Sequence, residues 1–181
     1  MGAHQKLDPA AADPFASFNA TAELQSWPCR TGKALNFAHK ELSEVARLWR
    51  EKAGDRAIPA RADIDARSLK SVLANVTILE RVAETGTRYR VRLHGTSQTK
   101  YSGDHTGAFL DDMLEGTADA YNAVYDLILN ERKPARILWD YQLPVIAYLK
   151  GESFVAPLLD ANGNVTLLLS VTFTESKTAI R

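Results

Sequence analysis

The stretch RYRVRLHGTSQTKYSGDHTG, residues 88 to 107, decides the fold. From Arg88 to His94 apolar residues alternate with basic ones, which is typical of a strand with one buried face. From Gly95 onward the stretch becomes polar and is interrupted by two further glycines, which favours short helices over one long helix. The sequence therefore predicts a strand that leads directly into short helices.

The segments on either side extend this pattern. NVTILERVAE predicts a partner strand, and the ETG turn joins the two strands into a hairpin. Downstream, a helical period runs from Thr117 to Pro134, and three strands follow, the first over Arg136–Leu143. The Asn162-Gly163 pair favours a tight turn between the last two strands. Upstream, apolar residues with helical spacing predict an amphipathic helix over residues 36–52.

This order of elements predicts an α+β domain. Hairpins at both ends, with helices grouped between them, indicate one five-stranded antiparallel sheet with short central helices on one face and an N-terminal flanking helix. Residues 36–181 form this single domain. Residues 1–35 are rich in alanine, proline and small polar residues, and we expect them to form a flexible or docking arm.

Composition excludes several classes of function. The 22 basic and 22 acidic residues cancel, so no overall field attracts nucleic acid or an anionic membrane. No apolar run approaches the roughly 20 residues of a membrane span. The single cysteine, Cys29, rules out an intramolecular disulfide framework and a thiolate metal cage, and it suits the cytoplasm. We expect no metal site, because Asp104, His105, Asp111 and Asp112 match no ligand spacing.

Three segments carry a resemblance to a known family: LWREKAGDRAIPARADID, YRVRLHGTSQTKYSGDHTG and FVAPLLDANGNVTLL. Together with the order of elements, they resemble the PAS domain over about residues 45–175, and more specifically the stand-alone, single-domain PAS proteins of bacteria. The resemblance implies a role in bacterial signal transduction, through small-molecule sensing or protein interaction, without catalytic activity.

The PAS resemblance also implies a pocket between the central helices and the sheet. A small organic metabolite is the expected ligand, and its contacts are predicted at Tyr101, His105, Tyr125, Trp139 and Tyr141. Each residue also has a plainer interpretation. His105 could be a rim histidine that faces water, and Trp139 could serve only to pack the core.

Cofactors known from other members of this family are restricted by the cysteine content. The flavin photoadduct needs a cysteine on a central helix, and c-type haem needs a CxxCH motif. The only cysteine lies in the predicted N-terminal arm, so both cofactors are excluded. His105 remains a possible ligand for haem b.

Two other functions compete with the sensor hypothesis. A small cone-shaped α+β enzyme, of the isomerase or dehydratase type, would use Asp140 or His105 as its base, but the common catalytic motifs are absent. A structural interaction module with a collapsed pocket is the other alternative. For the sensor and for the interaction module alike, we expect the partner to be a separate signalling protein or a second copy of the chain. Two copies would pair through the helix at 36–52.

Overall fold

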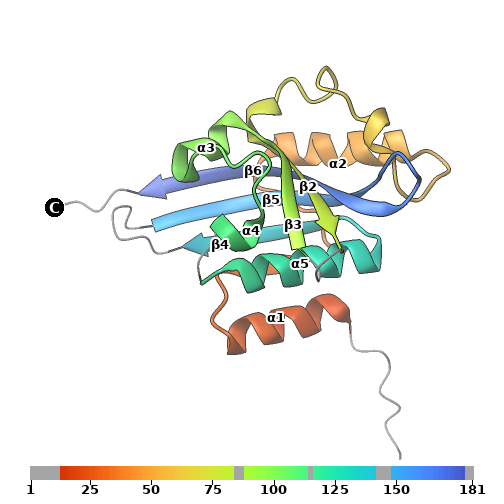
Figure 1. The fold of residues 1–181 in the computed structure, drawn as a ribbon. Coiled ribbons are helices and arrows are strands. Elements are labelled where there is room, and N and C mark those ends of the chain that lie inside the picture. The colour runs from red at the N-terminus through yellow and green to blue at the C-terminus, as the bar shows by residue number, and fades with distance from the viewer. Residues whose placement is uncertain (1–12, 84–87, 114–115, 142–147, 178–181) are drawn as a thin grey trace, which may run out of the picture.

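The computed structural model describes residues 13–83, 88–113, 116–141 and 148–177. They form one curved antiparallel sheet with helices on both faces (Figure 1). The strands follow in the order β1-β4-β5-β6-β2-β3. Their bounds are β1 Cys29–Gly32, β2 Val76–Val82, β3 Arg88–His94, β4 Ala135–Tyr141, β5 Tyr148–Leu159 and β6 Val165–Lys177. The predicted α+β class is confirmed, although the sheet has six strands where five were expected.

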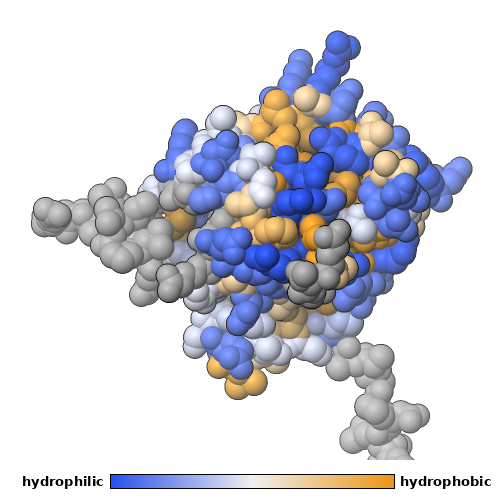
Figure 2. All heavy atoms as spheres, viewed as in Figure 1, coloured by the Kyte–Doolittle hydropathy of each residue, from blue (hydrophilic) through white to orange (hydrophobic). Residues whose placement is uncertain are grey.

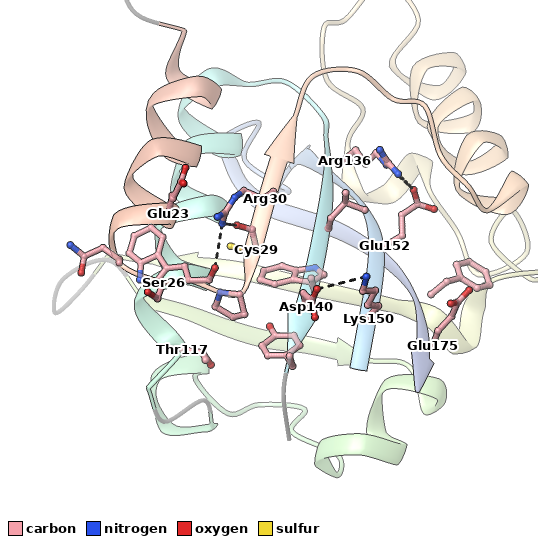
Figure 3. A pocket seen from close by; sticks show the side chains of 18 of the residues that line it. Glu23, Ser26, Cys29, Arg30, Thr117, Arg136, Asp140, Lys150, Glu152 and Glu175 are labelled. Atoms are coloured by element: carbon pink, nitrogen blue, oxygen red, sulfur yellow. Dashed lines mark hydrogen bonds and ion pairs between the residues drawn. The ribbon is translucent and has the colours of Figure 1, made fainter. Parts of the chain in front are cut away.

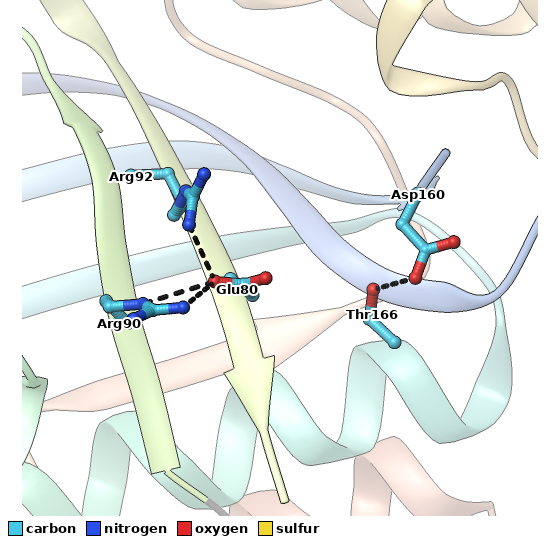
Figure 4. Close-up of polar contacts among 5 residues, drawn as sticks. All are labelled: Glu80, Arg90, Arg92, Asp160 and Thr166. Carbon is cyan, nitrogen blue, oxygen red and sulfur yellow. Dashed lines mark hydrogen bonds and ion pairs between the residues drawn. The ribbon is translucent and has the colours of Figure 1, made fainter. Parts of the chain in front are cut away.

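Both predicted hairpins are present. β2 pairs with β3, and β5 pairs with β6 along almost their whole length. At the tip of the second hairpin, Gly163 adopts a φ of +83°, which glycine tolerates without steric cost. The carboxylate of Asp160 accepts hydrogen bonds from the backbone N–H groups of Asn162 and Asn164 and from the Thr166 hydroxyl (Figure 4). This turn fixes the register of the two longest strands.

One face of the sheet is partly covered by α2 (Lys40–Ala53), the predicted flanking helix. Five of its apolar residues are buried, among them Trp49, whose indole Nε1 donates to the Pro157 carbonyl on β5 (2.9 Å). The helix ends at Gly54, whose φ is +55°. Because the apolar side of α2 packs on its own sheet, a second copy could meet only its polar side.

The other helices are grouped away from α2. They are α1 Pro14–Leu24, α3 Thr96–Ser102, α4 Leu110–Met113 and α5 Ala118–Glu131. α5 lies along the opposite face of the sheet from α2 and contacts β5 and β6 there. Five of its residues are buried against the sheet: Ala120, Val124, Tyr125, Ile128 and Leu129. None of the helices in the described ranges is long and apolar enough to cross a membrane.

The N-terminal segment adds a helix and the sixth strand. In the part of residues 1–35 that the structure describes, α1 packs beside α5, with Phe15 and Phe18 buried. β1 then pairs with β4 at the edge of the sheet. The Asn19 side-chain amide donates to the Thr31 carbonyl (2.8 Å) and accepts from the Thr31 N–H (2.9 Å). α1 and β1 are thereby joined.

The opposite edge of the sheet is rich in charge. Arg90 and Arg92 of β3 both bind the Glu80 carboxylate of β2, at 2.7 and 3.2 Å (Figure 4). Arg88 binds Asp111 (2.7 Å) and Asp112 (3.0 Å). Figure 2 shows hydrophilic residues across the middle of this side of the molecule. The arginines are neutralised within the chain, so they form no bare basic surface.

Candidate functional site

Three of the predicted ligand contacts come together in one aromatic cluster. We use this name for Tyr89, Tyr121, Tyr125, Trp139 and Tyr141. The Tyr121 ring of α5 stacks on the Trp139 ring of β4 (4.4 Å between centroids), and Trp139 stacks on Tyr141 (6.1 Å). Tyr125 meets Tyr89 edge-on at 5.4 Å, and the hydroxyls of Tyr121 and Tyr141 are hydrogen-bonded.

The aromatic cluster fills the space between α5 and the sheet. Tyr125 and Trp139 are buried, and the Trp139 Nε1 donates to the Ser153 hydroxyl (3.0 Å). A Cβ at Gly151 would lie 3.3 Å from Trp139 Cδ1, so glycine there leaves room for the indole. Burial raises the pKa of Tyr121 to about 12, although the hydrogen bond with Tyr141 opposes this shift. These rings pack the core, and their contact with a ligand stays a prediction.

The other two predicted contacts lie elsewhere along the chain. Tyr101 belongs to α3, but its side chain is outside what the structure describes. His105 follows α3 and lies beside His94 of β3, with 6.0 Å between ring centroids. Its backbone N–H donates to His94 Nδ1 (3.4 Å). Burial, and then the proximity of His105, lower the pKa of His94.

A groove of about 1270 Å³ opens across the ends of β4, β5 and β6, where α2 does not cover the sheet (Figure 3). One side of the groove is made by the end of α1 and by β1, and the start of α5 also contributes. The alternation of β4 directs Arg136, Leu138 and Asp140 to the face opposite Ile137 and Trp139. The floor of the groove is therefore on the sheet face that points away from α5.

The strand register arranges the groove floor in two rows. Leu138 lies opposite Glu152, which lies opposite Phe173. The second row is displaced by two residues along each strand: Asp140 lies opposite Lys150, and Lys150 lies opposite Glu175. The first row contains two apolar side chains, and Leu138 is 42% exposed. The second row is charged, and its Asp140 and Lys150 lie 3.8 Å apart.

Glu152 connects the groove to the beginning of α2. Its side chain is only 6% exposed and forms an ion pair with Arg136 (2.6 Å). It also accepts from the backbone N–H groups of Ala38 (3.0 Å) and His39 (3.1 Å), and the His39 ring stacks on Phe173. Burial alone would raise the pKa of Glu152, but these N–H groups and Arg136 together lower it. The carboxylate is thus ionised and holds α2 to the sheet.

The groove offers binding groups more than catalytic ones. Asp140, the alternative base, is exposed and lies beside Lys150. Cys29 lies in β1 and lines the groove from a buried position, where burial raises its pKa to about 11 and keeps it a thiol. Among the described residues, no group of three or more His, Cys, Asp or Glu side chains could hold a metal ion.

Sequence reasoning missed most of the groove. Arg30, Leu138, Glu152, Phe173 and Glu175 were not among the predicted site residues, whereas Trp139 and Tyr141 were predicted and are among the residues that line the groove. The signal for Leu138 was present, because strand alternation placed it on the face opposite Trp139. Alternation does not reveal which face of a sheet a helix will leave uncovered.

Comparison with known proteins identifies a family, and solved structures of low similarity also match. A model of the PAS domain matches residues 37–172. Among solved structures, a chain titled as an RNA-binding light-oxygen-voltage receptor matches with a TM-score of 0.41 and 15% identity. The match covers 64% of this chain and 35% of that one, so the present chain spans about a third of the receptor's length. A search of curated proteins found no match. α1, β1, Phe173 and Glu175 lie outside the segment that the family model matches.

Proposed function

The chain belongs to the PAS domain family, a family of sensory and interaction domains, and we propose that it relays bacterial signals by binding a partner protein in the groove. The proposal places the protein in the cytoplasm and assigns it no catalytic activity. The observation that carries it is a groove of about 1270 Å³ with an exposed leucine in its floor. Pockets for drug-sized ligands usually measure about 300 to 1,000 Å³, so this larger groove has room for a protein segment.

The link between the groove and α2 supports a relay. Glu152 and Phe173 form part of the groove floor and also contact Ala38 and His39 at the beginning of α2. A partner that displaces either side chain changes the contacts of the flanking helix. A bound segment can shift the position of α2 only if it favours one of two arrangements of this junction.

Photocrosslinking tests the docking proposal with a matched control. Leu138 in the groove and Leu73 outside it are similarly exposed, at 42% and 39%. Each is replaced in turn by p-benzoylphenylalanine in the full chain, which is then irradiated in the cells that produce it. We expect an adduct of one defined mass from position 138 and none from position 73. Equal adducts from both positions, or none from 138, would overturn the proposal.

Sensing of a small organic metabolite is the second candidate. Family membership supports it, and so does a chain of hydrogen bonds from Trp139 Nε1 through the Ser153 hydroxyl to that of Thr172 (2.7 Å). These hydroxyls lie on the α5 side of the sheet and could bind a polar ligand that separates the rings. A native mass spectrum of the 20.0 kDa chain tests this candidate. A defined additional mass that is lost on denaturation supports it, and the bare chain mass counts against it.

A further inference from the structure

The charges that line the groove do not balance. Five carboxylates and three basic side chains face it, which gives a formal net charge of −2 in a chain whose total is zero: Glu23, Asp119, Asp140, Glu152 and Glu175 against Arg30, Arg136 and Lys150. Negative charge is therefore concentrated at the groove.

All three basic groups have acceptors within the chain. Arg136 binds Glu152, and Lys150 binds Asp140. The Arg30 guanidinium donates to the Cys29 carbonyl (2.8 Å) and the Trp27 carbonyl (3.4 Å) (Figure 3). The carboxylates neutralise Arg136 and Lys150, whereas Arg30 keeps its charge and is held by carbonyl groups.

Three of the carboxylates remain exposed to a ligand. Glu23 comes from α1, Asp119 from α5 and Glu175 from β6, and no ion pair is recorded for any of them within the described ranges. They approach the groove from three separate elements, and its floor between them contains the exposed Leu138 and the half-buried Phe173. A ligand that matches this surface carries separated positive charges on either side of an apolar group.

We propose that the groove binds an extended segment of a partner protein in which lysine or arginine residues flank an apolar side chain. The inference rests on the proposed function and specifies the chemistry of the partner. A second copy of the chain fits less well, because a two-fold contact would place two negative grooves against each other. Electrostatic complementarity raises the association rate and excludes partners of the wrong charge.

Three synthetic peptides of equal length test the charge requirement. Fluorescein-labelled KLGKLGK, ELGELGE and SLGSLGS are titrated with the full chain, and binding is followed by fluorescence anisotropy. We expect KLGKLGK to bind at least about tenfold more tightly than ELGELGE, with an affinity that falls as added salt screens the charges. Equal affinity for all three peptides would overturn the inference.

Charge-reversed variants locate the site. Glu23→Lys combined with Glu175→Lys should reverse the preference, so that ELGELGE binds better than KLGKLGK. The matched control is Glu44→Lys with Glu51→Lys, which makes the same change in charge on the exposed side of α2. An equal effect of both double variants would show non-specific attraction and overturn the inference.

The remaining outcomes separate the inference from the proposed function. Suppose that ELGELGE or SLGSLGS binds best, and that Leu138→Gln weakens this binding while Leu73→Gln does not. The groove then docks protein segments, but the inference that the segment carries lysine or arginine is wrong. If no peptide binds, the inference fails, and the adduct at position 138 decides the docking proposal independently. A concentration-dependent dimer that Leu138→Gln abolishes would assign the groove to a second copy and overturn the inference.

Discussion

Trp139 and Leu138 are neighbours on β4, yet they lie in two different environments. Trp139 points toward α5, is buried among aromatic rings and donates a hydrogen bond to Ser153. Leu138 points to the other face and is 42% exposed in the groove. The α5 face is a closed core, whereas part of the opposite face is open to a partner.

The comparison separates residues that stabilise the domain from residues available for recognition. Aromatic residues in the sequence were predicted as ligand contacts because such side chains suit a ligand pocket. In the structure, the rings of the aromatic cluster mostly pack against one another. The open face instead presents leucine, phenylalanine and charged residues, which belong to no motif that marks a functional site in the sequence. Substitutions on the two faces should therefore have effects of very different size.

The largest effect is expected for Trp139→Ala. Removing a buried tryptophan leaves a cavity beside α5 and should lower the free energy of unfolding by about 3 to 5 kcal/mol. The adjacent Leu138→Ala is the control and should change it by no more than about 0.5 kcal/mol, because Leu138 is a surface residue. Urea denaturation of both variants measures the contrast. Similar losses for the two would show that the groove face is as tightly packed as the core.

Glu152→Gln should give the next largest effect, because Glu152 belongs to both regions. Loss of the charge leaves Arg136 without its ion pair, and we expect a cost of about 2 kcal/mol, less than the 3 to 5 kcal/mol for a fully buried pair. A double-mutant cycle with Arg136→Gln should be strongly non-additive. Hydrogen exchange of the Ala38 and His39 amides should also accelerate, since glutamine offers them one neutral acceptor oxygen where the carboxylate offered two charged ones.

The same carboxylate predicts a pH dependence. The folded-state pKa of Glu152 is lowered, so its contribution to stability is complete above the ordinary glutamate pKa of about 4.3 and is lost as the pH falls through the lower folded value. The stability difference between wild type and Glu152→Gln should therefore shrink across that acidic range. A constant difference from neutral to strongly acidic pH would contradict this assignment.

A smaller and opposite effect is expected at the groove rim. Ser26 has a φ of +55° at the end of α1, where a residue with a Cβ is strained. Ser26→Gly should stabilise the protein by about 1 kcal/mol. Gln25→Gly is the control, because Gln25 has an ordinary φ of −87° and glycine there should destabilise by about 0.5 kcal/mol. Thermal unfolding distinguishes the two signs.

The smallest effect is expected for Asp140→Asn on the groove floor. The Asp140 and Lys150 side chains are both more than half exposed and lie 3.8 Å apart. An exposed pair of this kind contributes about 0.2 to 1 kcal/mol, and added salt should remove the difference from wild type. Urea denaturation at low and high salt measures it. A loss of several kcal/mol would mean that the groove floor is part of the stabilising core.

Periodic patterns in the sequence predicted much of the fold. The apolar spacing near Trp49 predicted the helix observed as α2, and the alternation from Arg88 to His94 predicted β3. The four residues of β1 were missed, because a strand this short shows no useful alternation and depends on pairing with β4. The segment before it appeared unstructured because α1 has a weak apolar face and depends on α5 and β1 for its packing.

The candidate site was less predictable than the fold. A sequence shows that Leu138 and Trp139 face opposite sides of a strand, but not which side a helix covers. Here α2 covers only part of its face, and α1 and β1 supply one side of the groove. Coverage of this kind arises from contacts between distant segments and has no local signal.

The two hydrogen bonds between Asn19 and Thr31 oppose the addition of another strand at the β1 edge of the sheet. An edge strand with free N–H and C=O groups is a template on which another chain can add a strand, and successive additions lead to aggregation. At β1 the Asn19 amide occupies both backbone groups of Thr31, and Arg30 occupies the carbonyl of Cys29. The Asn19 amide thus takes the place that a seventh strand would have at this edge, and another chain cannot pair with Thr31 unless these hydrogen bonds break.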